Sequence, residues 1–284
     1  MIVHLIDGTY ELFRHFYGLR RFHKKDPPFG AVSAVLSMTL KMIEDGATHV
    51  GVATDHIIES FRNQLWPGYK TGAGIDRALW AQFHPLEEAL AAMGVVVWPM
   101  VEFEADDALA AAAQLASRDK KAEKVCIWTP DKDLAQCVVE DRVVQIDRRK
   151  NEIRGADAIT AKFGVVPEFI PDYLALVGDS ADGYPGLPGF GAKTSARLIN
   201  QHGPIEDFPA ALLSDTNREL ALLFKNLATL RTDAPLESPT LGRTVRRVAD
   251  LEWRGPQSGF DSIARKFDSE RLIARVAKLR RTTA

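Results

Sequence analysis

The sequence has few cysteines and no long apolar run. Its two cysteines, Cys126 and Cys137, do not form a closely spaced metal-binding pair. This excludes a disulfide framework and fits the reducing cytoplasm. No apolar run reaches the roughly 20 residues that a membrane-spanning helix requires. The chain enters a strand-like run at Ile2, without a signal peptide. We therefore expect a cytoplasmic protein that does not use a membrane.

The sequence also lacks a strong charge of either sign. Its formal net charge is −2, which by itself speaks against a nucleic-acid partner, because nucleic-acid-binding surfaces are basic. Two divalent cations bound by carboxylates would reverse the local sign. The hydrophobic fraction of 46% and the charged fraction of 26% are those of an ordinary globular protein. Composition therefore does not decide the partner.

Strand-like runs alternate with helical patterns in the first half of the chain. Strands are expected at 2–6, 50–54, 95–98, 125–128 and 142–146, and helices at 31–44, 76–93 and 105–117. This alternation predicts a parallel α/β sheet, in which ligands bind beyond the carboxyl ends of the strands. Asp7, Asp55, Asp131 and Asp133 all follow such ends, so we expect them to converge.

Basic and aromatic residues are interleaved between the second and third expected strands. They are Phe61, Arg62, Trp66, Tyr69, Lys70, Arg77, Trp80 and Phe83. Positive groups beside rings that stack on bases are typical of single-strand binding. Packing of the rings on the sheet explains the pattern equally well. Lys70, which precedes a glycine-rich stretch, is the strongest functional candidate.

Residues 156–234 carry helical patterns without a strand signal. Helices are expected at 156–163, 167–177, 193–201 and 217–231, with Gly164 and Gly203 ending two of them. We therefore divide the chain into an α/β unit (1–155), a helical unit (156–234) and a C-terminal extension (235–284). In the extension, 250–253 resembles a strand and 261–281 a basic helix. The positive face of that helix suits either nucleic acid or solvent.

Residues 178–194 combine carboxylates with a turn that suits a phosphate. Asp179 and Asp182 are followed by the small-residue turn 189–194, which leads into a helix. A helix N-terminus presents free backbone N–H groups to an anion. This combination predicts a place where a metal ion and a phosphodiester meet.

Acidic residues form the main candidate site. They are Asp7, Asp55, Glu104, Asp106, Asp107, Asp131, Asp133, Asp179 and Asp182. Singly, each could cap a helix or close a turn. Together at one sheet edge they would repel one another unless cations neutralise them. Oxygen ligands without histidine or cysteine favour Mg²⁺ or Mn²⁺ over zinc. Two such ions about 4 Å apart activate water and stabilise the leaving oxygen of a phosphodiester.

Two other phosphate-related motifs are excluded. Residues 6–9 together with 178–179 suggest a haloacid-dehalogenase-type phosphatase. That family needs an aspartate nucleophile two positions before Asp7, where this chain has Leu5. A P-loop needs Gly-Lys-Ser/Thr after a strand, whereas Ala192 precedes Lys193 and no strand comes before it.

The order of these motifs resembles the 5′-nuclease family, which includes flap endonucleases and the 5′→3′ exonuclease domain of bacterial DNA polymerase I. The matching segments are IDG (6–8), ATD (53–55), FR (61–62), GYK (68–70), EADD (104–107), TPDKDL (129–134), LALVGD (174–179), SAD (180–182), PGFGAKT (188–194) and LATLRTD (227–233). They are collinear from about residue 2 to residue 235. A match of this length and order is specific.

The resemblance implies a PIN-like parallel-sheet core with a helical arch, at about 56–94, and an all-α helix-hairpin-helix subdomain, with its hairpin at 186–199. It also implies two metal ions, Mg²⁺ with Mn²⁺ able to substitute, and a K⁺ ion at the hairpin. One group of metal ligands is then Asp7, Asp55, Glu104 and Asp106, and the other is Asp131, Asp133, Asp179 and Asp182. Asp107 is expected to be shared or to support these ligands.

The resemblance further implies contacts with DNA. Lys70 and Arg62 would steer the scissile phosphate as catalytic residues. DNA-binding roles fall on Arg14, Tyr69, Lys70, Gly189, Gly191, Lys193 and Thr194. The chain departs from the family pattern at 72–74, where Gly-Ala-Gly replaces a basic residue, and at Gly183, where the family usually has asparagine. These departures predict a weaker or different hold on the 5′ end.

From this resemblance we expect a free-standing, monomeric enzyme of DNA replication and repair. It would hydrolyse DNA near 5′ ends, at flaps, nicks or junctions, and leave 5′-phosphates. Two alternatives remain: a non-catalytic protein that binds branched DNA, and a PIN-type ribonuclease. The complete carboxylate set disfavours the first, because a binding protein gains nothing from repelling phosphate. The hairpin would be superfluous in the second.

Overall fold

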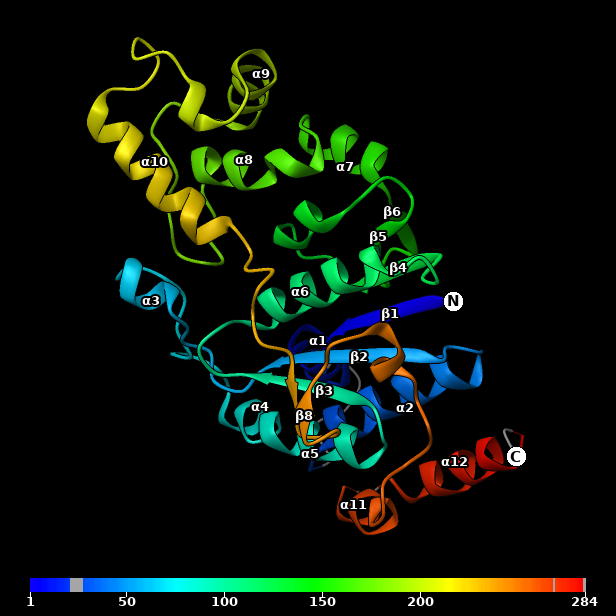
Figure 1. Cartoon of the computed structure of the whole chain (residues 1–284). Coiled ribbons are helices and arrows are strands. Elements are labelled where there is room, and N and C mark those ends of the chain that lie inside the picture. Colours follow the sequence, from blue (N-terminus) through cyan, green and yellow to red (C-terminus); the bar gives the residue numbers. More distant parts are fainter. Residues whose placement is uncertain (21–27, 268, 283–284) are drawn as a thin grey trace.

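The central sheet has six strands, five of them parallel (Figure 1). The computed structural model describes residues 1–20, 28–267 and 269–282. The strands are β1 (Ile2–Asp7), β2 (His49–Asp55), β3 (Val96–Met100), β4 (Lys124–Trp128), β5 (Val143–Asp147) and β6 (Glu152–Arg154), in the spatial order β3-β2-β1-β4-β5-β6. The predicted parallel α/β core is therefore confirmed, and the five strands expected in it are all present.

The edge strand β6 is not visible in the sequence pattern. It pairs antiparallel with β5, and in its three residues Ile153 lies between the charged Glu152 and Arg154. Its buried Arg154 donates to Asp147 Oδ2 at 3.1 Å. An ion pair therefore holds this strand where an apolar run would normally do so.

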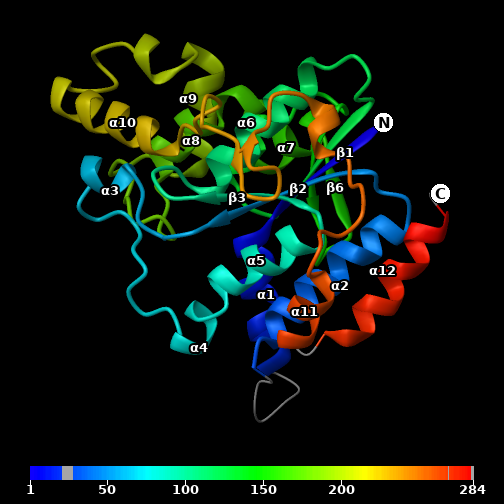
Figure 2. The ribbon, with the colours of Figure 1, turned by 60° about the horizontal axis from the view of Figure 1, so that its bottom comes forward.

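Helices cover both faces of the sheet (Figures 1 and 2). One face carries α1 (Gly8–Arg20), α2 (Gly30–Glu44) and α5 (Phe83–Ala92), which share a core with β1, β2 and β3. The other face is covered by α6 (Ala105–Arg118), whose buried alanines bring the helix close to the sheet. Burial on both faces explains the nearly continuous apolar runs of the strands.

The segment between β2 and β3 divides into an outer part and an inner part. The outer part contains α3 (Arg62–Leu65) and α4 (Arg77–Trp80), and the inner part is α5. The single helix expected at 76–93 is wrong, because the chain breaks after α4. There the buried Gln82 side chain accepts the amides of Ala31 and Val32, at 3.2 and 3.3 Å. Asp76 caps α4, as its sequence position suggests.

A separate core holds the helical unit together. It consists of α7 (Ala156–Phe163), η2 (Pro167–Phe169), α8 (Ile170–Val177), α9 (Ala192–His202), η3 (Ile205–Asp207) and α10 (Asp215–Ala228). Gly164 and Gly203 end α7 and α9 at positive φ, as predicted. The unit meets the sheet domain through η1 (Asp133–Cys137), which packs against α8. The predicted all-helical subdomain is confirmed.

The C-terminal extension completes the core of the sheet domain. It contains β7 (Glu237–Ser238), β8 (Arg243–Thr244), η4 (Val248–Leu251), α11 (Phe260–Lys266) and α12 (Glu270–Thr282). The strand expected at 250–253 is wrong, since a 3₁₀ helix ends there. The basic helix expected at 261–281 is two helices. Figure 2 shows both beside α2, and the buried Phe260 and Phe267 belong to the same core as α2 and α5.

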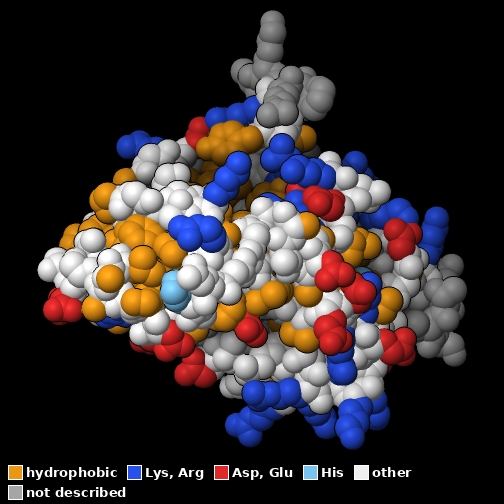
Figure 3. Space-filling model, turned by 90° about the horizontal axis from the view of Figure 1, so that it is seen from above, with side chains coloured by type: hydrophobic (Ala, Val, Ile, Leu, Met, Phe, Trp, Pro, Cys, Tyr) orange, Lys and Arg blue, Asp and Glu red, His pale blue; other side chains and the backbone are white. Residues whose placement is uncertain are grey.

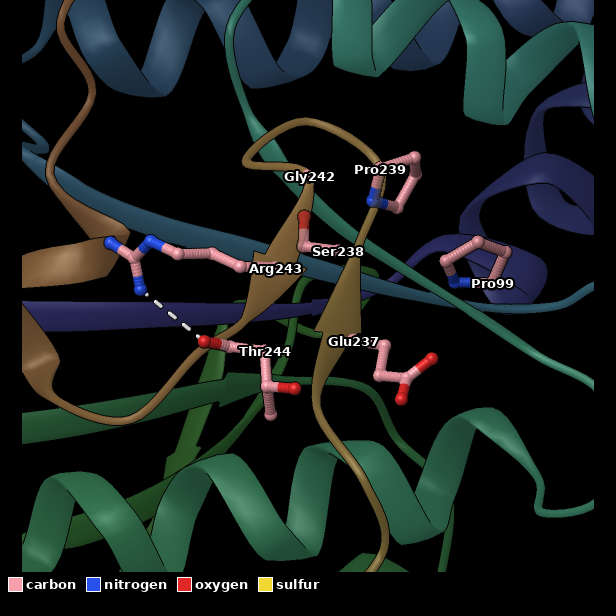
Figure 4. Close-up of a pocket in the computed structure, with 7 residues that line it drawn as sticks. All are labelled: Pro99, Glu237, Ser238, Pro239, Gly242, Arg243 and Thr244. Carbon is pink, nitrogen blue, oxygen red and sulfur yellow. Dashed lines mark hydrogen bonds between the residues drawn. The ribbon is translucent and has the colours of Figure 1, made fainter.

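The hairpin β7–β8 lies against β3 and borders an open pocket of about 520 Å³ (Figure 4). The pocket is lined by Pro99, Glu237, Ser238, Pro239, Gly242, Arg243 and Thr244. Arg243 is bonded to Asp250 at 2.8 Å, and none of the predicted acidic residues lines this pocket. It is therefore not the candidate site. Within the described ranges, no helix combines the length and the apolarity that crossing a membrane requires.

Candidate metal centre

The first group of carboxylates lies at the carboxyl edge of the sheet. Asp7 and Asp55 are the last residues of the neighbouring parallel strands β1 and β2. Glu104 and Asp106 follow β3, at the start of α6. Asp7 and Asp55 therefore lie at one edge of the sheet, as predicted, and the Ala105 amide, which donates to Asp55, places the start of α6 beside them.

Local hydrogen bonds fix the orientation of these side chains. Asp7 accepts the Tyr10 amide at 2.8 Å and the Thr129 hydroxyl at 3.0 Å. Asp55 Oδ1 accepts the amide of Ala105 at 2.8 Å. Asp55 Oδ2 is thereby left for a cation, whereas each Asp7 oxygen accepts one of these bonds and keeps one further lone pair for a cation.

The second group consists of Asp133, Asp179 and Asp182. Oxygens from all three lie within 4.8 Å of one another. Asp133 begins η1, while Asp179 and Asp182 occupy the tight turn after α8, in which the Gly183 amide donates to the Asp179 carbonyl at 2.9 Å. Among the described residues, the buried Asp133 Oδ1 has no hydrogen-bond partner. An unsatisfied buried carboxylate oxygen is suited to a metal ion.

Asp131 lies between the two groups. It is exposed, and its Oδ1 accepts the Asp133 amide at 3.0 Å. Its charge also raises the pKa of Asp7, Asp106 and Asp133. The expected assignment of Asp131 to the second group alone is therefore too narrow, because its field reaches both.

Burial and mutual repulsion disfavour ionisation of this centre. Burial raises the pKa of Asp7 to about 7, with further contributions from Asp55 and Asp131. Burial likewise raises the pKa of Asp55 to about 6, and it raises those of Asp106 and Asp133 well above their ordinary range. A divalent cation would reverse these shifts by favouring the charged form. The donor set, all carboxylate oxygen, fits Mg²⁺ or Mn²⁺.

Two lysines pair with these carboxylates. Lys70 Nζ lies 2.8 Å from Glu104 Oε2 and 3.0 Å from Asp182 Oδ1, so it connects the two groups. Lys132 Nζ lies 2.7 Å from Asp179 Oδ2. The sequence analysis did not select Lys132, although its place between Asp131 and Asp133 in the TPDKD run is a usable signal.

Gly183 brings the turn of the second group against the loop that carries Lys70. Its φ is 84°, and a Cβ atom there would lie 2.0 Å from the carbonyl oxygen of Gly68. In the same contact the indole of Trp66 donates to the Gly183 carbonyl at 3.0 Å, and the Lys70 amide donates to Asp182 at 2.9 Å. The departure at Gly183 is therefore part of how this chain closes its site.

Arg62 and Tyr69 have a different role in the structure from the expected contact with DNA, while Asp107 has the supporting role that is one of its two expected ones. Arg62 is 1% exposed and both of its terminal nitrogens bond Asp107, at 2.7 and 2.8 Å. Buried and fully engaged, Arg62 does not face a phosphate. Asp107 also accepts the Arg231 and Glu104 amides, so its oxygens are not free for a metal. Tyr69 is 3% exposed and its hydroxyl lies 3.3 Å from Glu104, which places it inside the protein instead of at DNA.

The remaining predicted DNA contacts lie at the surface. Gly189, Gly191 and Lys193 are exposed and Thr194 is half-buried, all at or just before the N-terminus of α9. Arg14 pairs with Glu11 and lines an open pocket of about 420 Å³ on α1. On the face shown in Figure 3, basic side chains are interspersed with acidic and hydrophobic ones, in line with the small net charge.

The glycine-rich departure at 72–74 packs on an aromatic side chain. The Gly72 amide donates to Glu59 at 3.0 Å. A Cβ atom at Gly72 would lie 2.7 Å from the ring of Trp80. Trp80 in turn stacks on Phe83 at 5.3 Å. The rings of this segment thus serve packing, which supports the structural interpretation of part of the aromatic pattern.

Family models cover most of the chain. Residues 2–164 match the 5′-3′ exonuclease N-terminal resolvase-like domain, and residues 165–250 match the 5′-3′ exonuclease C-terminal SAM fold. The boundary at 164–165 falls directly after α7, the first helix of the helical unit.

Individual proteins show the same similarity. A 5′-3′ exonuclease of Aquifex aeolicus is 29% identical over 95% of this chain and 99% of its own length. DNA polymerase I of Rhizobium leguminosarum is 33% identical over 82% of this chain, which spans only 25% of that protein. In fold, the chain is similar to the bacteriophage T5 D15 flap endonuclease in a complex with DNA and metal ions. That structure has a TM-score of 0.61 and 19% identity, covering 98% of this chain and 100% of the other.

Proposed function

The chain belongs to the 5′-3′ exonuclease family, and we propose that it is a divalent-metal-dependent nuclease that hydrolyses DNA near 5′ ends, at flaps, nicks or junctions. The products would carry 5′-phosphates, as DNA replication and repair require. One observation carries the proposal: the closely spaced oxygens of Asp133, Asp179 and Asp182, with the buried Asp133 Oδ1 left without a partner among the described residues. Such a group needs a cation.

We assign the carboxylates to two cation positions. Asp7, Asp55, Glu104 and Asp106 would hold one Mg²⁺, and Asp133, Asp179 and Asp182 the other, with Asp131 between them. Two such ions supply a nucleophile at neutral pH and stabilise the leaving oxygen of the phosphodiester. Thr129 and the Tyr10 and Ala105 amides keep the Asp7 and Asp55 carboxylates oriented toward this edge.

Lys70 is the residue that we assign to the scissile phosphate. Its ammonium is held by Glu104 and Asp182. When cations neutralise these carboxylates, the attraction between them and Lys70 weakens. The Lys70 side chain is 30% exposed, so its ammonium can then turn toward a phosphate oxygen. We assign no phosphate contact to Arg62.

The helical unit would hold the duplex. Gly191 is the N-cap of α9 and Gly189 has a φ of 85°, so backbone amides and the exposed Lys193 face outward together. Such a turn suits a DNA phosphate, and a K⁺ ion at its carbonyl groups would strengthen that contact. Arg14, about two helical turns beyond Asp7 on α1, is a further phosphate contact on the sheet domain.

Cleavage of labelled flap, nicked and blunt DNA in Mg²⁺ tests the proposal. The wild-type protein should cut near the 5′ end, and Asp179→Ala and Asp131→Ala should lose most of this activity. Equal cleavage by these variants would refute the assignment. Binding of flap DNA without turnover in Mg²⁺ or Mn²⁺ would instead identify a binding protein, and preference for a matched RNA flap would identify a ribonuclease.

A further inference from the structure

Residues 227–231, here called the crossing segment, lead the chain from α10 back to the sheet domain. Buried or half-buried side chains hold the segment from two sides. Arg62 reaches it from α3, and Gln136 reaches it from η1. Arg62 also contacts Glu104 of the first acidic group, and Gln136 also contacts Asp133 of the second. The crossing segment is therefore tied to both halves of the metal centre.

Arg62 makes the first connection. Its Nε donates to the Leu227 carbonyl at 2.8 Å and its terminal nitrogens grip Asp107. One of those nitrogens also lies 3.4 Å from Glu104 Oε1. Asp107 in turn accepts the Arg231 amide at 2.8 Å. Arg62 and Asp107 thus clamp both ends of the crossing segment against the start of α6, where the first acidic group lies.

Gln136 makes the second connection. Its Nε2 donates to the Ala228 carbonyl and to the Asp133 carbonyl, each at 2.9 Å. Its Oε1 accepts the Leu230 amide at 3.0 Å. The Gln136 side chain thereby fixes the centre of the crossing segment relative to Asp133, the first residue of the second acidic group.

We propose that Arg62 and Gln136 are positioning residues that set the distance between the duplex-holding helical unit and the metal centre, and so select the phosphodiester that is cut. This inference rests on the proposed nuclease function. DNA held at α9 can be cut only where its backbone reaches the carboxylates. A misplacement of about 1 Å lowers the rate at the selected phosphodiester by roughly 10²-fold, so cuts at neighbouring phosphodiesters then make up a larger share of the products.

Arginine is required at position 62 for a geometric reason. Its planar fork grips both oxygens of Asp107 while Nε reaches a carbonyl on the opposite side. Lysine keeps the positive charge but cannot make these contacts simultaneously. Arg62→Lys therefore tests the geometry without leaving Asp107 and Glu104 without a positive partner.

The matched control is Arg275→Lys on α12. Arg275 grips both oxygens of Glu44, at 2.9 and 2.8 Å, and also contacts Ser37. It repeats the chemistry of Arg62 at a place far in the sequence from every predicted site residue. Any effect shared by the two variants is a general cost of losing a bidentate arginine.

Two measurements on the full-length chain decide the matter. Amide hydrogen exchange should be faster at residues 229–231, by at least about tenfold, in Arg62→Lys and unchanged there in Arg275→Lys. On a flap of fixed sequence in Mg²⁺, Arg62→Lys should spread the products to positions adjacent to the wild-type cut, with its DNA affinity in EDTA within about twofold of wild type. Arg275→Lys should keep the single cut.

Unchanged exchange together with a single wild-type cut in Arg62→Lys would overturn the proposal. So would a fall in DNA affinity without a shift of the cut, which would mean that Arg62 contacts a phosphate. If Arg62→Lys does not fold, Gln136→Leu provides the same test, with the same exchange and cut-position criteria. If the wild-type protein cuts no DNA, the nuclease function fails, while the exchange experiment still decides whether these residues hold the crossing segment.

Discussion

The side chain and the main chain of Lys70 both contact Asp182: the ammonium lies 3.0 Å from a carboxylate oxygen, and the amide donates to the Asp182 carbonyl at 2.9 Å. The loop that carries Lys70 and the turn that carries Asp182 are therefore fixed to each other before any substrate arrives. The main chain of Lys70 holds the loop to the turn, and its side chain provides the positive charge. Because the main-chain bond survives when the side chain is removed, the two roles can be tested separately.

Replacing Lys70 with alanine should slow DNA cleavage by about 10²-fold, the usual cost of losing a group that stabilises developing charge. Metal binding should remain or improve, because the ammonium competes with cations for Glu104 and Asp182. Single-turnover cleavage and calorimetric Mn²⁺ titration measure the two effects separately. Weaker Mn²⁺ binding by Lys70→Ala would show that the lysine supports the metal instead of the phosphate.

Replacing Gly183 with alanine should destabilise the protein far more than the same change at Gly189. Both have φ near 85°, so both substitutions carry the left-handed penalty of about 1–2 kcal/mol. Only at Gly183 would the new Cβ meet a carbonyl oxygen, whereas at Gly189 the described residues leave it open space. Denaturant unfolding of the two variants isolates the steric part. Equal losses of stability would contradict the close contact with Gly68.

Replacing Asp133 with asparagine should raise the melting temperature of the metal-free protein while removing most of the cleavage activity. Burial, and after it repulsion by Asp131, Asp179 and Asp182, raises the pKa of Asp133, and a neutral amide removes the cost of both. The variant should also gain less stability from added Mg²⁺, since ligand stabilisation follows the affinity of the folded state. Thermal unfolding in EDTA gives the melting temperature of the metal-free protein, and the increase on adding Mg²⁺ gives the stabilisation by the ion. A lower melting temperature in EDTA would contradict the repulsion.

The metal-free protein should lose stability through Asp7 as the pH rises from about 5 to about 7.5. The pKa of Asp7 is about 7 in the fold and near 4 when unfolded. In this window the folded state therefore holds a proton that the unfolded chain releases, so its advantage falls with rising pH. His15, half-buried and with a pKa lowered by burial to about 4, acts in the opposite direction. The difference between wild type and Asp7→Asn isolates the Asp7 contribution. If this difference does not change with pH, the buried environment assigned to Asp7 is wrong.

Replacing Phe267 with alanine should cost about 3–5 kcal/mol of unfolding free energy, as large core truncations do. Phe267 is fully buried and meets Phe29 at 5.0 Å between ring centroids. Leu212→Ala, at a position 37% exposed, is the control and should change stability by at most about 0.5 kcal/mol. Urea unfolding of the two variants compares them. A small effect at Phe267 would mean that the C-terminal extension only rests on the sheet domain.

The sequence predicts the strands and the first acidic group well for one shared reason. A buried parallel strand is a short apolar run, and the residue that follows it lies at the ligand-binding edge. Asp7 and Asp55 can therefore be placed from the sequence alone. Patterns that depend on periodicity, such as that of α6, are recovered in the same way.

Partners that are far apart in the chain cannot be predicted from the sequence, because no local pattern specifies them. The pairing of Arg62 with Asp107 joins residues 45 positions apart, and a buried arginine looks the same in sequence as one that binds phosphate. The resemblance to known nucleases gives residue types without burial, which is why Arg62 and Tyr69 are expected to contact DNA although both are buried. The packing of the C-terminal extension on the sheet domain cannot be predicted for another reason. Its apolar residues are spread over two short helices, so no single periodic run marks α11 as part of the core.

Because β1 lies inside the sheet, with strands on both sides, its position affects the order in which the sheet can form during synthesis. The first strand to leave the ribosome needs β2 on one side and β4 on the other, so the sheet grows outward from it. The last pieces of the core around α2 and α5 are Phe260, Phe267, Leu272 and Val276. Because the nascent chain emerges from its N-terminus, this core stays open to solvent until those residues have been made. A nascent chain that stalls before residue 260 should therefore be a target for chaperones and proteases even if its carboxylates are already in place.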